Sequence, residues 1–454
     1  MRCRPAQGSG YRAIWHAAIT TMNEMQSIQR NMEEAIRLLE ARFLEREELI
    51  RLLLLGLMSH ENALLVGPPG TAKSQLARAV SQLFGGGRWF DYLLTRFTTP
   101  DEMFGPVSLQ QLKQDRYVRQ TDGYLPAADF AFLDEIFKAN SAILNSLLSI
   151  LNERVFFNGR EKQQAPLVFL IAASNELPEE NEQLAALYDR FLIRYEVGYL
   201  KHMSSYERMF QLPDEPLPAL LSLKDAETVQ AAVRDVTIPE TLIYMLYQLK
   251  TSMEAKEFAL SDRRWRKIGH VWKTSAALNR RSEVNVWDTV YTPHMLWDFP
   301  EDATALQEIF QKAFQEALGQ ETERELPIRK YDRIAKHWAG KEDELHAFQF
   351  KKEVGGRMSK EDQEKAKANL EECRLELEET ARELRGKLIL WLQREKDLPG
   401  YIRNRNFLLL QTAQYAVKYT HLRIQGERIL QTLQGLYRTL FDREIPGVEY
   451  DYTL

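Results

Sequence analysis

A turn rich in glycine and proline, residues 67–72, carries the first residues whose types and spacing favour chemistry. It follows the apolar run Leu64–Val66, and Lys73 and Ser74 then open an amphipathic helix. Backbone N–H groups of such a turn can surround phosphate oxygens, and the helix dipole favours their negative charge. Lys73 would reach the β- and γ-phosphates, and the Ser74 hydroxyl would hold Mg²⁺. The candidate nucleotide-binding residues here are Gly67, Pro68, Pro69, Gly70, Thr71, Ala72, Lys73, Ser74 and Gln75.

Ala72 departs from the usual form of this motif, in which glycine directly precedes the lysine. We expect a methyl group to fit there if the φ angle of Ala72 is negative. Taken alone, the segment also fits an ordinary strand–turn–helix. A second signal is therefore needed to separate nucleotide binding from a plain structural turn.

The second signal is an apolar run that ends in two acids. Residues 130–133 are followed by Asp134 and Glu135, so both carboxylates fall at the end of a buried strand. Asp134 is placed to hold Mg²⁺, directly or through water, and Glu135 to polarise a water for attack on the γ-phosphate. Alone, this run would indicate only a strand that exits into a loop. In this order, the two motifs predict a P-loop ATPase that uses ATP and Mg²⁺.

A third apolar run, Leu167–Ala173, leads to Ser174 and Asn175. Asn175 is placed to sense the γ-phosphate, and an ordinary strand-end turn is the alternative interpretation. Strands and helices alternate over residues 63–200, as a doubly wound parallel sheet requires. The expected fold class is therefore α/β, with helices flanking a parallel sheet.

Longer strings make the assignment more specific. With them, the chain resembles the AAA+ ATPases of the MoxR family, and most of all its RavA (regulatory ATPase variant A) branch. The resemblance covers residues 35–300 approximately. The strings that carry it are Gly67–Ser74, Leu94–Pro106, Asp122–Pro126, Phe132–Ile136, Ile150–Arg154, Ala173–Pro178, Tyr188–Phe191 and Ser261–Trp265.

The resemblance implies roles for further residues. Asn175 corresponds to the first sensor of the family, and Arg190 to the arginine finger that reaches the ATP of the neighbouring subunit. Arg194 lies four residues later and is an alternative finger if that segment is helical. Arg263 or Arg264 matches the second sensor on the helical lid. The catalytic candidates are Glu135, Asn175, Arg190, Arg194 and Arg263, and the metal candidates are Ser74 and Asp134.

An arginine finger supplied by a neighbour is worth about 10³–10⁵ in rate, so activity should require contact between subunits. The resemblance implies that these subunits form a hexameric ring. MoxR relatives usually act beside a protein with a von Willebrand factor A domain, whose metal-ion-dependent adhesion site binds a carboxylate. We therefore expect the chain to assemble with itself and to act with such a partner.

The composition of the 454-residue chain is that of an ordinary globular protein, with 28% charged residues. Its net charge of −5 gives no reason to expect nucleic-acid binding. Cys3 and Cys373 are far apart, which predicts neither a disulfide framework nor a metal cluster. No apolar run approaches the roughly 18 residues of a membrane span, and no secretory signal is expected. Cytoplasm is the expected compartment.

Changes in pattern along the chain predict four parts. Prolines at 213, 216 and 218 mark a linker, because proline disfavours helix at the residue before it. Apolar positions at helical spacing indicate helix over 22–60 and in the lid, where Arg263 lies near the start of the third helix. The predicted parts are 1–35, a partly disordered N-terminal extension; 36–212, the AAA+ α/β nucleotide-binding domain; 213–300, the helical lid; and 301–454, a helical C-terminal domain.

The C-terminal part is predicted as a long-helix hairpin. Residues 359–396 carry an apolar seam from Leu370 to Trp391, and a second helix is expected over 404–441. Leu398–Gly400 breaks the pattern, so the two helices should fold back antiparallel. RavA proteins carry a β-rich insert here that binds the inducible lysine decarboxylase. The sequence shows no such insert, so that partnership is not inferred.

The functional hypotheses differ in what ATP is used for. The first is a chaperone-like remodeller driven by hydrolysis. The alternative is a nucleotide-gated scaffold in a stress or defence complex with little turnover, against which Glu135 and Arg190 argue. A DNA-dependent motor shares the fold, but the acidic balance of the chain argues against it. Segments matching Arg116–Arg119 and the Asn158–Gly159 hairpin face the ring surface or pore in the family. The alternative is a plain surface hairpin for the first and a structural hairpin beneath the sheet for the second.

Overall fold

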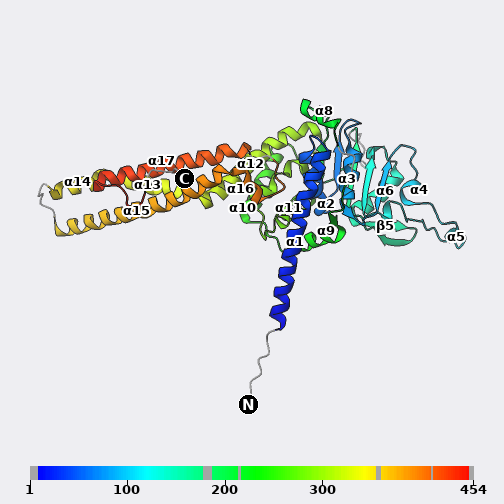
Figure 1. Cartoon of the computed structure of the whole chain (residues 1–454), viewed down its shortest axis with the longest axis horizontal. Helices are drawn as coiled ribbons and strands as arrows, with labels where there is room; N and C mark the ends of the chain where they lie inside the picture. Colours follow the sequence, from blue (N-terminus) through cyan, green and yellow to red (C-terminus); the bar gives the residue numbers. More distant parts are fainter. Residues whose placement is uncertain (1–8, 177–186, 213–215, 354–358, 411–412, 449–454) are drawn as a thin grey trace, which may run out of the picture. The chain divides into compact units, whose positions relative to one another are not determined.

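The computed structural model of the chain describes residues 9–176, 187–212, 216–353, 359–410 and 413–448 (Figure 1). The chain forms two compact units. The first is Met1–Phe314 with Asn406–Leu410, and the second is Gln315–Arg405 with Gln411–Leu454. Cys3, the start of the predicted extension and residues 213–215 of the predicted linker lie outside the described residues.

Five parallel strands form the central sheet of the first unit, in the order β3-β4-β7-β1-β8. Apolar residues fill most of them, as strands covered by helices on both faces require. Since β7 lies between β1 and β4, the loops after these three strands meet at one edge of the sheet. The parallel order confirms the predicted α/β fold class. The strands are β1 Ala63–Val66, β3 Trp89–Leu93, β4 Phe130–Asp134, β7 Phe169–Ser174 and β8 Ile193–Glu196.

Helices and the predicted hairpin complete this core. Gly159 in the hairpin turn has φ +65°, and a Cβ there would lie 2.0 Å from the Tyr117 carbonyl oxygen. The Asn158 side chain accepts the Arg119 N–H at 2.6 Å and donates to the Arg119 carbonyl at 3.0 Å, which ties the hairpin to the loop after α5. The elements are α2 Glu47–Met58, α3 Lys73–Gln82, α4 Pro100–Phe104, α5 Leu109–Leu112, η1 Leu125–Ala127, η2 Ile136–Lys138, α6 Ser141–Glu153, β5 Val155–Asn158 and β6 Glu161–Gln164.

The first helix starts before the sequence-based boundary at residue 36. α1 runs over Ser9–Arg42 and packs on α2, on β9 (Leu221–Ser222) and on α9 (Leu223–Val233). Its apolar face extends before residue 36, so residues 25–35 of the predicted extension pack into the folded unit. The buried positions of this face include Met25, Ile28, Met32, Ala35, Ile36 and Leu39.

The lid is helical, and Arg263 lies near the start of its helix α11, as predicted. α11 packs on α2 and α9. Its Lys267 ammonium lies 2.6 Å from the carboxylate of Glu61, which precedes β1. Because the glycine turn follows the other end of β1, α11 contacts the amino edge of the sheet. The remaining elements of this region are β2 Phe84–Gly85, α8 Met203–Met209, α10 Glu240–Glu254, α11 Asp262–Leu278, η3 Val286–Thr289, η4 Thr292–Met295 and η5 Pro300–Asp302.

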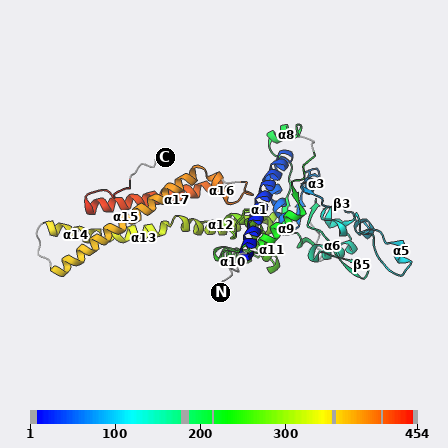
Figure 2. The ribbon, with the colours of Figure 1, turned by 60° about the horizontal axis from the view of Figure 1, so that its bottom comes forward.

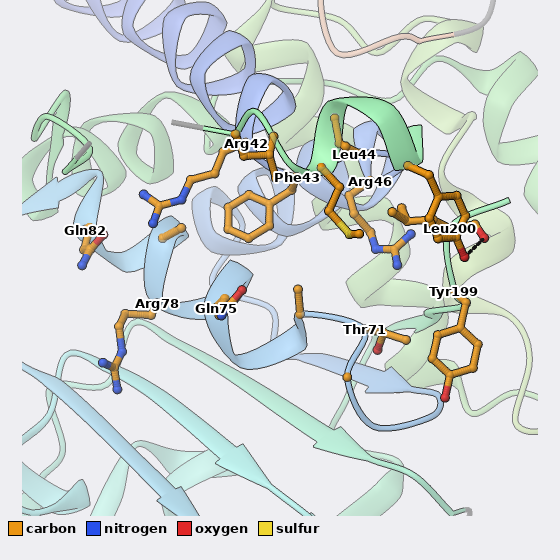
Figure 3. Close-up of a pocket in the computed structure, with 16 residues that line it drawn as sticks. Arg42, Phe43, Leu44, Arg46, Thr71, Gln75, Arg78, Gln82, Tyr199 and Leu200 are labelled. Atoms are coloured by element: carbon orange, nitrogen blue, oxygen red, sulfur yellow. Dashed lines mark hydrogen bonds between the residues drawn. The ribbon is translucent and has the colours of Figure 1, made fainter. Parts of the chain in front are cut away.

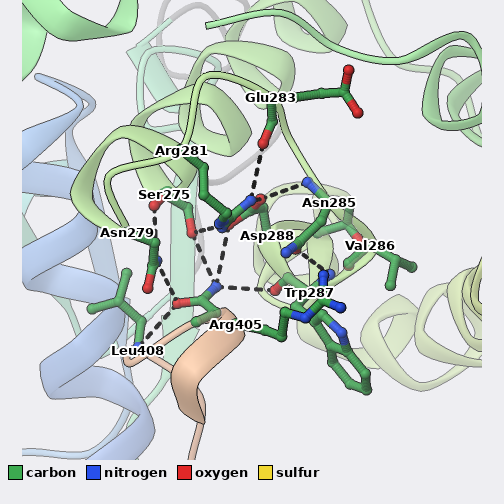
Figure 4. Close-up of polar contacts among 12 residues, drawn as sticks. Ser275, Asn279, Arg281, Glu283, Asn285, Val286, Trp287, Asp288, Arg405 and Leu408 are labelled. Carbon is green, nitrogen blue, oxygen red and sulfur yellow. Dashed lines mark hydrogen bonds and ion pairs between the residues drawn. The ribbon is translucent and has the colours of Figure 1, made fainter. Parts of the chain in front are cut away.

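A segment from late in the chain, Asn406–Leu410, completes the lid core (Figure 4). The buried Asn406 side chain donates to the Ser275 hydroxyl at 3.0 Å and to the Trp287 carbonyl at 3.1 Å. It accepts from the Asn279 side chain at 3.0 Å. The sequence places all of residues 301–454 in one C-terminal part. The structure differs because this segment supplies hydrogen-bond partners to buried polar groups of the lid.

The second unit is a bundle of long helices (Figures 1 and 2). α15 and α17 run antiparallel: the Trp391 indole donates to the Tyr419 carbonyl at 3.0 Å, and the Tyr437 hydroxyl to Glu378 at 2.7 Å. The predicted seam of α15 is buried from the free thiol of Cys373 to Trp391. The helices are α12 Ala303–Glu325, which begins in the first unit, α13 Ile328–Ala339, α14 Glu342–Glu353, α15 Lys360–Lys396, α16 Leu398–Arg405 and α17 Ala413–Phe441.

The helical pattern is interrupted after α15, as predicted, but residues 398–400 do not form the turn that joins the two long helices. Residues 398–400 open the short helix α16, because the Asp397 side chain accepts the Gly400 N–H at 3.0 Å and proline fits the first turn of a helix. α17 then begins at Ala413 and not at residue 404. Among the described residues of this unit, none lies in a strand, as expected without the β-rich insert. Across the described chain, no helix is long and apolar enough to cross a membrane.

Candidate active site

The glycine turn borders an open space at the carboxyl end of β1. Gly67 has φ +151° and donates its N–H to the Ser174 carbonyl at 3.0 Å. A Cβ there would lie 2.2 Å from the Val197 carbonyl oxygen, so glycine is required. Gly70 has φ +78°, and no described atom lies within 4 Å of a Cβ placed on it. The turn therefore has room for a ligand on the side of Gly70.

Ala72 has φ +63°, so the condition under which its methyl group was expected to fit is not met. The left-handed conformation costs alanine about 1 kcal/mol, yet the turn keeps the backbone that glycine usually adopts here. α3 begins at Lys73, and among the described residues no side chain caps this end. Its first N–H groups are therefore available to an anion.

Three polar side chains from neighbouring segments meet beside the turn. Lys73 Nζ donates to two carbonyls of the turn, at 2.7 and 2.9 Å, and lies 3.3 Å from Asn175 Oδ1. The Asn175 amide donates to the Glu135 carboxylate, which also pairs with Lys138 at 3.3 Å. The structure thus links Lys73, Asn175 and Glu135 in one chain of hydrogen bonds.

The two metal candidates flank this chain of contacts. Asp134 ends β4 and accepts the Glu135 N–H at 3.0 Å, and Ser74 is exposed in the first turn of α3. Carboxylate and hydroxyl oxygens are suitable ligands for Mg²⁺, so the donor set fits this ion. Burial lowers the pKa of Lys73, while the charges of Asp134 and Glu135 oppose that shift.

A hollow of about 640 Å³ adjoins the turn (Figure 3). Its walls include Phe43 at the end of α1, Arg46 before α2, Tyr199 after β8, and Thr71 and Gln75. The sequence gives no sign that Phe43, Arg46 and Tyr199 share a site, because isolated residues far from a motif carry no spacing signal. They come together only through the packing of α1 and β8 around the turn.

Arg194 and Arg264 lie in a different cluster, around Asp298. Arg194 is fully buried, contacts Asp298 and three main-chain carbonyls, and stacks 4.0 Å from the centre of the Tyr188 ring. Arg264 is 2.8 Å from the same carboxylate. Burial lowers the pKa of Arg194 to about 10. A side chain enclosed in this way cannot reach a neighbouring molecule while its surroundings remain folded.

Arg190 and Arg263 share a surface at the amino edge of the sheet. Arg190 lies shortly before the amino end of β8 and pairs with Asp189 at 3.0 Å. Burial and the charge of Arg263 lower its pKa. Arg263 is exposed and donates to Asn152 at 3.1 Å. The structure therefore brings these two candidates together, away from the glycine turn of their own chain.

Comparison with known proteins gives a consistent assignment. Residues 30–211 match the MoxR domain in the MoxR–vWA–β-propeller ternary systems, and residues 241–310 match an AAA lid domain. Protein MJ0079 of Methanocaldococcus jannaschii is 42% identical over 287 residues, 63% of this chain and 75% of that protein. The chaperone MoxR1 of Mycobacterium tuberculosis is 24% identical over 246 residues, 53% of this chain and 63% of MoxR1.

A solved structure shows a related fold. The crystal structure of a Cytophaga hutchinsonii protein described as an ATPase superimposes with a TM-score of 0.54 at 18% identity. The match covers 66% of this chain and 98% of that one, and at this identity it is evidence for the fold alone.

The glycine turn, the strand-end acids and the parallel sheet have the arrangement of a P-loop nucleotide-binding protein with a AAA lid. The chain belongs to the MoxR family of AAA+ ATPases. Membership implies nucleotide binding, usually with Mg²⁺. A place in the RavA branch stays a prediction, because these matches identify the wider family.

Proposed function

We propose that this chain binds ATP with Mg²⁺ and hydrolyses it. The observation that carries the proposal is the Lys73–Asn175–Glu135 chain of contacts beside the open glycine turn. A phosphate-binding cation, a γ-phosphate sensor and a water-activating carboxylate are thereby gathered at one edge of the sheet. The family match supports the same activity.

Binding of ATP requires these side chains to change partners. Lys73 exchanges the carbonyls of the turn for β- and γ-phosphate oxygens, and the free N–H groups of α3 face the same phosphates. Asn175 then donates to the γ-phosphate and releases Glu135, whose carboxylate orients the attacking water. Ser74 and Asp134 would hold Mg²⁺, which neutralises phosphate charge.

The hollow beside the turn is assigned to the nucleoside. Its volume of about 640 Å³ is suitable for a small ligand. Phe43 and Tyr199 offer aromatic surface to a base, and Arg46 and Gln75 offer polar contacts. The position next to Thr71 and Gly70 aligns this space with the phosphate turn.

Catalysis is proposed to be completed by a neighbouring copy in a hexameric ring. Arg190 is the preferred finger, because Arg194 is buried against Asp298. Arg263 lies on the same surface as Arg190, so we assign it to the neighbour's nucleotide as well. The ion pair between Lys267 and Glu61 supports this assignment, because it holds α11 at the edge opposite its own glycine turn.

The work done with ATP is proposed to be remodelling of a client protein together with a von Willebrand factor A partner. The description of the matched MoxR domain, in MoxR–vWA–β-propeller systems, supports this partner. Co-purification of the tagged chain from a native extract is expected to recover such a protein. Repeated recovery of the chain without one would count against the partnership.

The first experiment measures phosphate release against protein concentration for wild type and Glu135→Gln. We expect specific activity to rise with concentration in the wild type and to be lost in the variant, with ATP still bound by both. ATP binding without turnover at any concentration would favour the nucleotide-gated scaffold.

A further inference from the structure

The most exposed large apolar side chain among the described residues is Phe97, at 91%. It sits in a turn held by several hydrogen bonds. The Thr95 N–H donates to the Thr98 hydroxyl at 2.9 Å, the Phe97 N–H to the Thr95 hydroxyl at 3.2 Å, and the Asn140 side chain to the Thr98 carbonyl at 2.7 Å. Single exposed apolar residues are ordinary, but this ring is presented by a fixed backbone, which reduces the entropy lost on binding.

The lid of the same chain has a hollow that matches such a ring. It lies between α10 and α11 and has a volume of about 440 Å³. Trp265 and Trp272 form part of its wall, and Ile238, Ile243 and Leu246 add aliphatic surface. Ile243 is half exposed at its lip, next to the exposed rings of Tyr244 and Tyr247. Aromatic rings inserted into pockets of this kind commonly anchor protein interfaces.

The charges near the two features are complementary. Arg266 and Lys273 line the hollow and carry positive charge. On the other side, the turn of Phe97 continues into Asp101 and Glu102, of which Asp101 is 57% exposed although it contacts Arg119. With Arg96 included, residues 96–102 carry one net negative charge. A contact between the two regions would therefore bring the carboxylates of Asp101 and Glu102 near Arg266 and Lys273.

Each feature lies near one half of the proposed active site between two copies: Phe97 near the acidic motif, and the lid hollow near Arg263. Phe97 follows β3, whose last residue Leu93 pairs with Asp134 of the acidic motif. Trp265 lies two residues after Arg263, in the first turn of α11. A neighbour that presents Arg190 and Arg263 to the phosphates therefore also presents its lid hollow to the loop after β3.

We propose that Phe97 of one copy inserts into the α10–α11 hollow of the neighbouring copy. The two surfaces are different patches of one chain, so the contact is head-to-tail and repeats around a closed ring. This inference rests on the proposed trans ATPase and names the contact that assembles it. The partner is thus a second copy of this chain.

The test compares Phe97→Ala and Ile243→Lys with wild type. Sedimentation velocity gives assembly, and phosphate release gives the protein concentration at half-maximal specific activity. We expect each variant to raise that concentration at least tenfold while ATP affinity stays unchanged. Leu109→Ala, which removes another exposed apolar side chain, is the matched control and should behave as wild type.

A mixture of the two variants tests the direction of the contact. The Ile243→Lys copy still has Phe97, and the Phe97→Ala copy still has an intact hollow, so an equal mixture should assemble at lower concentration than either variant alone. Assembly of Phe97→Ala at the wild-type concentration, or a mixture no better than its components, overturns this contact alone. Wild type that stays monomeric with ATP overturns both the contact and the proposed ring.

Discussion

The two edges of the central sheet hold charged groups in opposite ways. At the carboxyl edge, Lys73, Asn175 and Glu135 form hydrogen bonds beside an open hollow. At the amino edge, Arg194 is buried against Asp298, and Lys267 fixes the lid to Glu61. Groups at the first edge can exchange partners when a ligand arrives, whereas those at the second hold the lid in place. Within one chain, the groups that can exchange partners with a ligand are thus separated from the groups that attach the lid.

The largest expected effect comes from Arg190, at the amino edge but free of the buried cluster. Arg190→Ala should lower phosphate release about 10³-fold or more, because a trans cation no longer stabilises the transition state. Thermal unfolding should change little. Mixing this variant with Glu135→Gln should restore part of the activity, since some sites then combine an intact acid with an intact finger. Absence of any recovery in mixed assemblies would argue against action in trans.

Replacing Arg194 should affect stability and not catalysis directly. Arg194→Met removes a fully buried cation and leaves main-chain carbonyls without partners, which should cost about 3 kcal/mol of unfolding free energy. Urea unfolding measures this loss. Arg78→Met, which breaks an exposed pair with Asp91, is the control and should change stability by about 0.5 kcal/mol or less. Equal effects of the two variants would remove the contrast between the edges.

The stability of the fold should also fall in acid, because of a histidine at the amino edge of the sheet. Burial, with smaller effects of Arg154 and His270, lowers the pKa of His60 from 6.5 to about 4. Below pH 6.5 the unfolded chain takes up a proton that the folded chain does not, so stability falls as pH drops from 6.5 towards 4 and is unaffected above that range. At pH 5 the loss is roughly 2 kcal/mol.

Urea unfolding at pH 7.5, 6 and 5 measures this dependence, and His60→Asn should make it shallower. Asparagine is the matched replacement because it tolerates the left-handed backbone of residue 60, where φ is +56°. An unchanged slope in the variant would show that His60 is not the group responsible. His270, whose pKa burial also lowers, should keep part of the dependence in the variant.

The smallest effect is expected at the carboxyl edge. Ala72→Gly should stabilise the fold by about 0.5–1 kcal/mol, because glycine adopts the left-handed backbone without the clash of a methyl group. ATP affinity should be kept. Ala142→Gly, an exposed alanine of helix α6, is the control and should destabilise the fold. Destabilisation by both changes would mean that Ala72 carries no strain.

The carboxyl edge was the part that the sequence could predict. Asp134 and Asn175 lie at the ends of apolar runs, and Lys73 follows the glycine turn after a third run, so the strand order brings them together. The positive φ angle of Ala72 could not be predicted, because the fold of the turn determines it and the presence of alanine in the sequence does not indicate a left-handed backbone. The nucleoside hollow was missed because Phe43 and Tyr199 meet only in the folded chain.

The amino edge depends on contacts that spacing does not encode. Arg194 lies four residues from Arg190 and looked equivalent to it, but strand β8 buries Arg194 against Asp298, about a hundred residues further on. The break at Leu398–Gly400 was placed correctly as an interruption. The predicted turn was wrong, because the Asp397 side chain accepts the Gly400 N–H and residues 398–400 form the start of helix α16.

The return of Asn406–Leu410 to the lid has a consequence for biosynthesis. The family match to the lid ends at residue 310, yet the Asn406 side chain and the buried Leu408 belong to the same core. On the ribosome, the lid core is therefore incomplete until the chain has been translated through residue 410. A nascent chain released before that point would leave buried polar groups such as Asp288 and Ser275 short of partners.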